Sequence, residues 1–349
     1  MVSVVECAQA EASSLNRQVT NMIRSRILIA GAGSIGRKHL ANLHGMNIGD
    51  LAVCDPDKER AYAGAGQELP VFTDFHGALE QFQPSAVFVC SPPIFHVEQT
   101  LAAIHSGADV FMEKPVSNSM DKVHDLIAAA EACGRVVQVG YNLRFDPGVR
   151  RLKDIVERET IGRVLWARAE VGHYLPNWRP WQDYRLSYTG RKELGGGVIL
   201  DLSHEMDYLT WILGDPIQIL CMSAHTGTLA VDVEDSASIL LRFRSGAHAD
   251  LHMDCLQRSR TRICKLVGEK GTAQWDAVTS ELRVWVDGKE HVASCASDPN
   301  DSYVAEVRHF LECVERRSTP LVDLKHAIRV LELCLIAQAS SEPVAVEDS

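Results

Sequence analysis

The sequence predicts a two-domain α/β protein, with a doubly wound parallel sheet in the first half and an α+β arrangement of mostly antiparallel strands in the second. Three observations predict this class. The chain has 349 residues, which is about two domains at roughly 150 residues each. The first half alternates short apolar runs with amphipathic helix patterns, as βαβ units do. After residue 162 the pattern changes to successive strands separated by turns, which is typical of an antiparallel meander.

The composition limits the classes of protein to which the chain can belong. Hydrophobic residues make up 46% of the chain, which excludes wholesale disorder. The 35 basic and 46 acidic residues give a net charge of −11, which argues against nucleic acid as a partner. No uncharged apolar run reaches the roughly 18 residues of a membrane span, so we expect no membrane partner. The ten cysteines form no CxxC pair and several lie in apolar runs, which predicts reduced thiols in a cytoplasmic protein.

Residues 1–22 are predicted to be a flexible extension, to which we assign no function. The segment contains Glu6 and Glu11 but no basic start and no long apolar core. It therefore does not fit a secretory signal, and transit peptides avoid acidic residues. The predicted division of the remaining chain is a first domain at 23–145, a second domain at 146–342 and a frayed tail at 343–349.

A glycine-rich motif lies between the first strand and the first helix. Arg26–Ala30 is an apolar run of strand length, residues 31–36 read Gly-Ala-Gly-Ser-Ile-Gly, and a helix pattern follows. In this context the GxGxxG spacing predicts the dinucleotide-binding turn of a Rossmann fold. Gly31 allows the tight turn, Gly33 the approach of a pyrophosphate, and Gly36 the close packing of helix on strand. The motif residues expected at the cofactor are Gly31, Gly33, Ser34, Ile35 and Gly36.

The second strand ends in a carboxylate that predicts which nucleotide is bound. It spans Leu51–Cys54, and Asp55 follows 19 residues after Gly36. An acid at this distance accepts a hydrogen bond from the ribose 2′-hydroxyl and would repel the 2′-phosphate of NADP. The sequence therefore predicts NAD, with NADP as the less favoured cofactor. Lys58 and Arg60 weaken the preference, because a nearby basic residue can accept the phosphate.

Three more strands of the first half end in polar or proline-containing segments. The strands are predicted at 86–90, 110–112 and 135–139, and the helices between them at 96–106 and 121–133. Ligands of such sheets bind beyond the carboxyl ends of the strands. Residues at these ends are therefore expected at the cofactor or, for the last two, at the substrate: Ser91, Pro92, His96, Glu113, Lys114, Tyr141 and Arg144.

The second half combines an aromatic segment, a helix that begins after glycines, and a series of strands. A strand at 164–171 precedes the aromatic-rich residues 174–181. Gly195-Gly-Gly197 leads into a helix that contains Asp201, His204 and Asp207. The later elements are predicted strands at 217–226, 236–244, 247–256, 261–268, 272–276 and 281–286, followed by helices at 301–316 and 323–340.

The aromatic segment has two interpretations. Trp178 is expected to stack on the face of a sugar, and Arg179 and Arg185 to pair with a carboxylate or phosphate of the substrate. The alternative is that the segment packs against another subunit.

The predicted strand from 247 to 254 has an apolar face and a polar face, and the polar face contains two histidines. His248 and His252 would stand about 13 Å apart on an extended strand, too far for one ion. We therefore expect no metal site, and interpret this face as solvated or as a contact with a second subunit.

Four segments, in this order, resemble the Gfo/Idh/MocA oxidoreductases, a family named after glucose–fructose oxidoreductase and inositol dehydrogenase. They are residues 31–36, Ser91-Pro-Pro-Ile-Phe-His96, Glu113-Lys-Pro115 and the Gly195-Gly-Gly segment with its Asp201, His204 and Asp207. The resemblance implies a Rossmann domain at 23–145 followed by a substrate-binding domain with a large, open sheet. It also implies a homodimer or homotetramer that assembles through this sheet.

The same resemblance implies roles for two residues. Lys114 would lie beside the nicotinamide and hydrogen-bond the reacting hydroxyl, and His204 would be the general base. An imidazole suits this task because its unperturbed pKa lies near neutrality. Members of the family often place an aspartate four residues before the histidine, where this chain has Leu200. On a continuous helix Asp201 and Asp207 would both lie on the His204 face, so either could take that place, and Asp201 is the catalytic candidate.

The predicted activity is NAD-dependent hydride transfer to or from a ring hydroxyl or keto carbon of a sugar, sugar derivative or inositol. The expected substrate contacts are Lys114, Tyr141, Arg144, Trp178, Asp201 and His204. One alternative is a redox-neutral, NAD-dependent glycoside hydrolase of the same family. Another is a non-catalytic NAD-binding sensor or regulatory subunit, against which the retained Lys114 and His204 argue.

Overall fold

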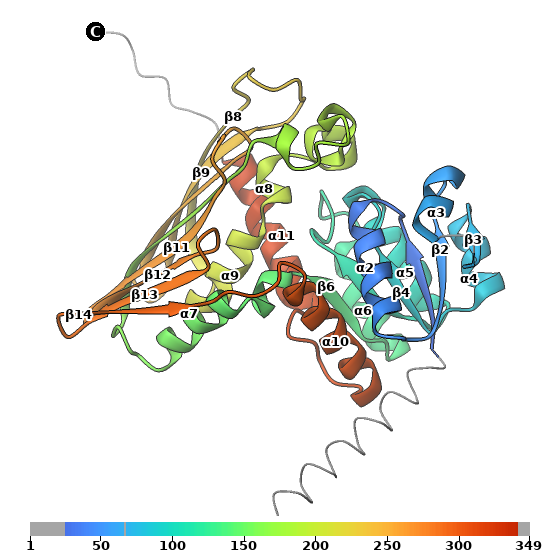
Figure 1. Cartoon of the computed structure of the whole chain (residues 1–349), viewed down its shortest axis with the longest axis horizontal. Coiled ribbons are helices and arrows are strands. Elements are labelled where there is room, and N and C mark those ends of the chain that lie inside the picture. Colours follow the sequence, from blue (N-terminus) through green and yellow to red (C-terminus); the bar gives the residue numbers. More distant parts are fainter. Residues whose placement is uncertain (1–24, 66–67, 341–349) are drawn as a thin grey trace, which may run out of the picture.

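The chain folds around two sheets, one formed by its first half and one by its second (Figure 1). The computed structural model describes residues 25–65 and 68–340. The predicted extension at 1–22 and the predicted tail at 343–349 lie outside these described residues. In the part of the chain that the structure describes, no helix is long and apolar enough to cross a membrane.

The first sheet has six parallel strands in the order β3-β2-β1-β4-β5-β6, which confirms the predicted doubly wound Rossmann sheet. The strands are β1 (Arg26–Ala30), β2 (Asp50–Cys54), β3 (Val71–Phe72), β4 (Ala86–Val89), β5 (Asp109–Glu113) and β6 (Val137–Gly140). The chain reverses its direction of winding between β1 and β4. Ligands of such sheets bind at this switch point, beyond the carboxyl ends of the strands.

Helices connect these strands, and the turn between β1 and the first of them depends on glycine. The helices are α2 (Ser34–Gly45), α3 (Lys58–Ala65), α4 (Phe75–Phe82), α5 (His96–His105) and α6 (Val123–Cys133). Gly31 has a φ of 100°, and a Cβ there would lie 2.7 Å from the backbone of Cys90. A Cβ at Gly36 would lie 1.9 Å from the Gly31 carbonyl oxygen. Only glycine at both positions lets α2 start this close to the sheet.

The second sheet has eight strands in the order β14-β13-β12-β11-β7-β10-β9-β8. They are β7 (Val164–Gly172), β8 (Pro216–Ala224), β9 (Ser236–Phe243), β10 (His248–Asp254), β11 (Thr261–Gly268), β12 (Gly271–Asp276), β13 (Glu281–Val286) and β14 (Lys289–Ser294). Strands β7 and β10 pair in parallel and all other neighbours are antiparallel. This confirms the predicted mostly antiparallel sheet.

One face of the second sheet is covered by helices, and the other faces outward (Figure 1). The covering helices are α7 (Pro147–Glu157), α8 (Val198–Asp201), α9 (His204–Leu213) and α11 (Leu324–Ala339). On β10 the side chains of Ala249, Leu251 and Met253 are buried on the covered side, whereas His248 is exposed. The predicted division of this strand into an apolar and a polar face is therefore confirmed.

The two helices at the end of the chain join the two halves. Helix α10 (Asp301–Arg316) follows the second sheet in sequence but packs against α2 and the first sheet. There Phe310 lies edge-on to Phe88 and Phe111, with ring centroids 5.6 and 5.8 Å apart. Helix α11 contacts both β8 of the second sheet and β6 of the first.

The predicted helix through Asp201 and His204 is two helices instead of one. Helix α8 ends at Asp201, the backbone turns at Leu202 and Ser203, and α9 begins at His204. The expectation that Asp201 and His204 share one face of a continuous helix is therefore wrong. The break arises because Leu202 leaves the helical region, with φ −96° and ψ 24°, so the spacing of three residues no longer sets the direction of the side chains.

Candidate active site

A cleft of about 1150 Å³ lies where the carboxyl ends of the first sheet face the second domain. It is lined by residues of the glycine turn, of the segments that follow β2, β4, β5 and β6, of the second domain between β7 and α9, of the start of β11 and of α10. The sequence-predicted residues that line it are Gly31, Gly33, Ser34, Ile35, Asp55, Ser91, Pro92, Glu113, Lys114, Trp178, Asp201 and His204. Four further predicted residues, Gly36, His96, Tyr141 and Arg144, lie outside its lining.

The glycine turn presents open backbone to one end of the cleft. A Cβ placed on Gly33 would meet no atom within 4 Å. Helix α2 begins directly after it, and no side chain of the described residues caps this helix N-terminus. Unpaired backbone N–H groups at a helix start attract anions such as phosphate. This end of the cleft therefore fits the pyrophosphate of a dinucleotide.

Asp55 is held at the same end by backbone hydrogen bonds. Its Oδ2 accepts a hydrogen bond from the Ala32 N–H at 2.8 Å, and its Oδ1 one from the Asp57 N–H at 2.9 Å. The guanidinium of Arg60 lies 4.0 Å away and is half exposed. Each carboxylate oxygen retains a lone pair that a ribose hydroxyl could use.

His96 braces the loops of the nucleotide-binding half instead of lining the cleft. Its ring is buried, and its two nitrogens lie 2.8 Å from the carbonyl oxygens of Ser91 and Pro115. It thereby ties the segment after β4 to the segment after β5. Lys114 lies between these tethers and the second domain.

Lys114 and Asp201 form an ion pair between the two domains. The Lys114 ammonium donates hydrogen bonds to the Asp201 carbonyl oxygen at 2.6 Å and to Asp201 Oδ1 at 2.9 Å. Asp201 also accepts hydrogen bonds from the hydroxyls of Tyr188 and, at 2.7 Å, Thr189. Burial disfavours the charged carboxylate, but Lys114 and the two hydroxyls outweigh it and hold the pKa of Asp201 below its ordinary value.

His204 is a buried imidazole that is neutral at neutral pH. Burial, reinforced by the positive charges of Lys114 and Arg262, holds its pKa well below the ordinary value of 6.5. Its Nδ1 has no hydrogen-bond partner among the described residues, and the edge of the Tyr141 ring packs against it at 5.5 Å between centroids. That Nδ1 atom is itself buried, but His204 lines the cleft, and a neutral imidazole in such a position can accept a proton.

Neither candidate acid forms a hydrogen bond with His204. Asp201 instead pairs with Lys114, and Asp207 is buried on α9 with the guanidinium of Arg144. The Arg144 Nε donates to Asp207 Oδ1 at 3.1 Å and to Oδ2 at 3.0 Å. Its Nη2 donates to Oδ1 at 2.9 Å. His326 lies beside both partners, with its Nε2 3.1 Å from Asp207.

Tyr141 and Arg144, which follow β6, are buried behind the cleft, although their neighbours Gly140 and Asn142 line it. Arg144 is 2% exposed, and Tyr141 is fully buried with its hydroxyl 3.2 Å from Ser203 Oγ. Both residues hold this segment against α9, directly behind His204. Neither Tyr141 nor Arg144 lines the cleft, and their contact with a substrate stays a prediction.

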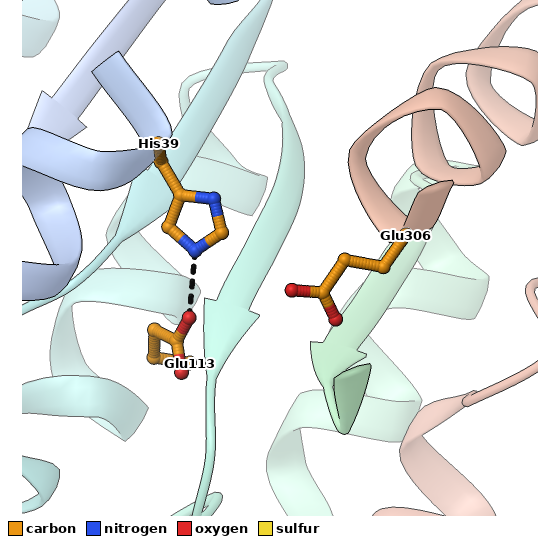
Figure 2. A group of neighbouring side chains, drawn as sticks. All are labelled: His39, Glu113 and Glu306. Carbon is orange, nitrogen blue, oxygen red and sulfur yellow. Dashed lines mark hydrogen bonds and ion pairs between the residues drawn. The ribbon is translucent and has the colours of Figure 1, made fainter. Parts of the chain in front are cut away.

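Behind Glu113 lies a buried cluster that the sequence analysis does not identify. Figure 2 shows His39 from α2, Glu113 from the end of β5 and Glu306 from α10, with the side chains converging. His39 Nε2 lies 2.7 Å from Glu113 Oε1. Burial raises the pKa of Glu306 well above its ordinary value, and the negative charge of Glu113 raises it further. The cluster therefore favours a protonated Glu306 and holds Glu113 at the floor of the cleft.

The same three residues are a set that could hold a metal ion, since one ligand atom from each lies within 4.8 Å of the others. Imidazole and carboxylate groups are suitable ligands. The 2.7 Å contact between His39 and Glu113 is, however, a hydrogen-bond distance, and a protonated Glu306 is a weak ligand. The expectation of no metal stays a prediction.

Of the residues that the sequence analysis missed, only His39 has a local signal. It follows Gly36 by three residues, so it lies on the side of α2 that packs against the sheet. Tyr188 and Thr189 lie 13 and 12 residues from Asp201, in an irregular segment whose spacing predicts no contact. Glu306 reaches Glu113 from helix α10, near the end of the chain.

Comparison with known proteins identifies the class to which this fold and site belong. Residues 25–141 match the model of an oxidoreductase family with an NAD-binding Rossmann fold, GFO/IDH/MocA, and residues 149–274 match the GFO/IDH/MocA C-terminal domain. The chain belongs to this family.

Relatives cover most of the chain. An inositol 2-dehydrogenase of Cereibacter sphaeroides is 32% identical over 298 residues, which are 82% of this chain and 85% of the relative. A myo-inositol 2-dehydrogenase of Thermotoga maritima is 27% identical over 339 residues, which cover 91% of this chain and 96% of the relative. The structure of the WlbA dehydrogenase from Bordetella pertussis, in complex with NADH and UDP-GlcNAcA, shares the fold with a TM-score of 0.78 and 20% identity, over 93% of this chain and all of that one.

We expect the Arg144→Met substitution to destabilise the protein by about 3–5 kcal/mol, because it leaves the buried Asp207 charge without its guanidinium. Chemical unfolding measures this. The matched control is Arg163→Met, since Arg163 forms an exposed ion pair with Glu269 and should cost no more than about 1 kcal/mol. Equal effects of the two substitutions would show that the buried pair does not hold this part of the fold.

Proposed function

We propose that this protein is an NAD-dependent dehydrogenase or reductase that acts on a ring hydroxyl or keto carbon of a sugar, sugar derivative or inositol. The observation that carries the proposal is the convergence of Lys114, Asp201 and His204 on one cleft, beside a glycine turn and helix N-terminus suited to a dinucleotide. The family is an oxidoreductase family, and several relatives are named inositol 2-dehydrogenases.

The three side chains divide the proton chemistry among them. NAD, when bound, would accept or supply the hydride. The Lys114 ammonium would donate a hydrogen bond to the reacting oxygen and fix its position, while Asp201 keeps the lysine in place. His204, neutral because of its burial and its cationic neighbours, would take the hydroxyl proton as the carbon is oxidised. In the reverse direction the imidazolium would return the proton.

The choice of NAD over NADP rests on Asp55. Its buried carboxylate lines the nucleotide end of the cleft and would accept a ribose hydroxyl, whereas a 2′-phosphate would be repelled. Arg60, 4.0 Å away, offsets part of that repulsion. We therefore propose a preference for NAD that is not absolute.

Replacing Lys114 or His204 by alanine should slow turnover by roughly a hundredfold or more while NAD affinity changes little, as expected for lost acid–base assistance. Steady-state kinetics and NAD titration measure the two effects. Lys325→Ala removes an exposed lysine outside the cleft and serves as the control. A comparable loss of NAD binding in the two active-site variants would contradict their assignment to the chemical step.

The activity itself is tested by following absorbance at 340 nm with NAD⁺ and a panel of sugars, inositols and nucleotide sugars. Net formation of NADH supports the proposal. Cleavage of a glycoside without net NADH would point to a redox-neutral hydrolase, and NAD binding without any reaction in either direction would point to a sensor.

Asp55→Ala should weaken NAD binding and narrow the discrimination against NADP, because the carboxylate both accepts the ribose hydroxyl and repels the phosphate. The ratio of the two dissociation constants in wild type and variant measures this. An unchanged ratio would remove Asp55 from the ribose site.

We also propose that the outward face of the second sheet joins copies of this chain into a dimer or tetramer. Large apolar side chains on its edge strand β8 and the neighbouring strand β9 are exposed, among them Leu220, Met222 and Leu240. Leu220 and Leu240 are register partners on adjacent strands. A contiguous apolar surface of this kind is typical of a protein–protein contact.

We expect the wild-type protein to sediment as a dimer or tetramer and Leu240→Asp to shift it toward the monomer, because a charge is then buried in the contact. Ile336→Asp, at an exposed apolar position on the covering helix α11, is the control and should leave the assembly intact. A monomeric wild type would contradict the proposal.

A further inference from the structure

Two arginines in the cleft have no carboxylate partner among the residues that the structure describes. They are Arg179 and Arg260. The other cations of the second domain's side of the cleft are paired, Arg262 with Glu205 at 2.9 Å and Arg191 with Glu193. Lys114 is neutralised by Asp201. This part of the cleft therefore carries two positive charges that the protein itself does not balance.

The fold brings the two arginines to one rim of the cleft. The antiparallel pairing of β7 and β11 matches Gly172 with Thr261, and the residues that flank this last pair are His173 and Arg260. The Trp178 ring stacks on His173 and donates its N–H to the His173 carbonyl oxygen at 2.8 Å. Arg179, the next residue, is thereby anchored on the same side as Arg260.

This rim belongs to the same cleft as the proposed reactive groups, which are Lys114, Asp201 and His204. The positive charge of Arg179 acts on the hydroxyl of Tyr188, the residue that donates to Asp201, and also on the hydroxyl of Tyr303 at the floor of the cleft. Burial lowers the pKa of Arg260, and the like charge of Arg262 lowers it further. An anion bound beside Arg260 would offset its repulsion by Arg262.

We propose that Arg179 and Arg260 bind an anionic group, a carboxylate or a phosphate, on the substrate beside the ring carbon that reacts at Lys114 and His204. The guanidinium fork matches both groups through two parallel hydrogen bonds. The cofactor's pyrophosphate is a separate anion, because the glycine turn and α2 lie at the other end of the cleft. This inference rests on the proposed function and names the substrate class of the same site.

The test measures binding of three sugars to the full chain saturated with NADH: D-glucose, D-glucuronate and D-glucose 6-phosphate. At least one of the anionic sugars should bind about tenfold or more tightly than glucose, which corresponds to about 1.4 kcal/mol. Tighter binding of glucuronate identifies a carboxylate subsite, and tighter binding of the phosphate ester a phosphate subsite. Arg179→Gln and Arg260→Gln should each remove most of this advantage without changing the dissociation constant of NADH.

The sequence pattern predicts a substrate contact for Arg185 as well, but Arg185 is exposed, already paired with Asp183 and outside the cleft lining. Arg185→Gln is therefore the matched control. It should keep the preference for the anion. Failure of both anionic sugars to bind more tightly than glucose, or an advantage that survives in both cleft variants, would overturn the inference. The proposed function would still stand in that case if the enzyme reduces NAD⁺ with a neutral sugar or inositol, and it would fail only if no substrate of any charge reacts.

Discussion

The ion pair between Lys114 and Asp201 is the interaction on which the site depends. Lys114 follows strand β5 of the first domain, and Asp201 ends a short helix of the second, 87 residues away. Two hydrogen bonds from the ammonium, one to the carboxylate and one to the carbonyl oxygen of the same residue, fix the distance across the cleft. Tyr188 and Thr189 hold the other side of the carboxylate. Because both hydrogen bonds of the Lys114 ammonium end on this one buried residue, a shift of either domain would break the two together.

The same charges explain the ionisation states of His204 and Asp201. His204 is buried beside two cations, so its imidazole stays neutral, whereas Asp201 stays ionised because its partners outweigh the cost of burial. Asp207, three residues beyond His204, is committed to Arg144 and stabilises the helix that carries the imidazole. Two acids close in sequence thus serve different purposes, one in the cleft and one behind it. The two acids differ in the cation that each one faces, which is Lys114 for Asp201 and Arg144 for Asp207.

The cleft has two ends that differ in electrostatics. The nucleotide end is formed by unpaired backbone N–H groups and by Asp55, which together suit a pyrophosphate and a ribose. The opposite end contains paired charges at the reactive groups and two unbalanced arginines, Arg179 and Arg260, at the rim. A neutral polyol would use only the reactive groups, whereas an anionic sugar would also use the rim. Under the proposed function, the choice of substrate would thus depend on residues that do not take part in the chemical step.

The sequence by itself determined the features that depend on neighbours along the chain. The strand–glycine–helix turn, the acid at the end of β2 and the alternation on β10 follow from local periodicity and spacing, and the structure confirms the fold they predict. Only the tertiary structure decided which polar groups meet. It joined Glu113 to His39 across 74 residues, and it buried Arg144 where the sequence places a substrate contact. The physical reason is that these pairings arise when helices and sheets pack face against face, and no local pattern records the distance between side chains on different elements.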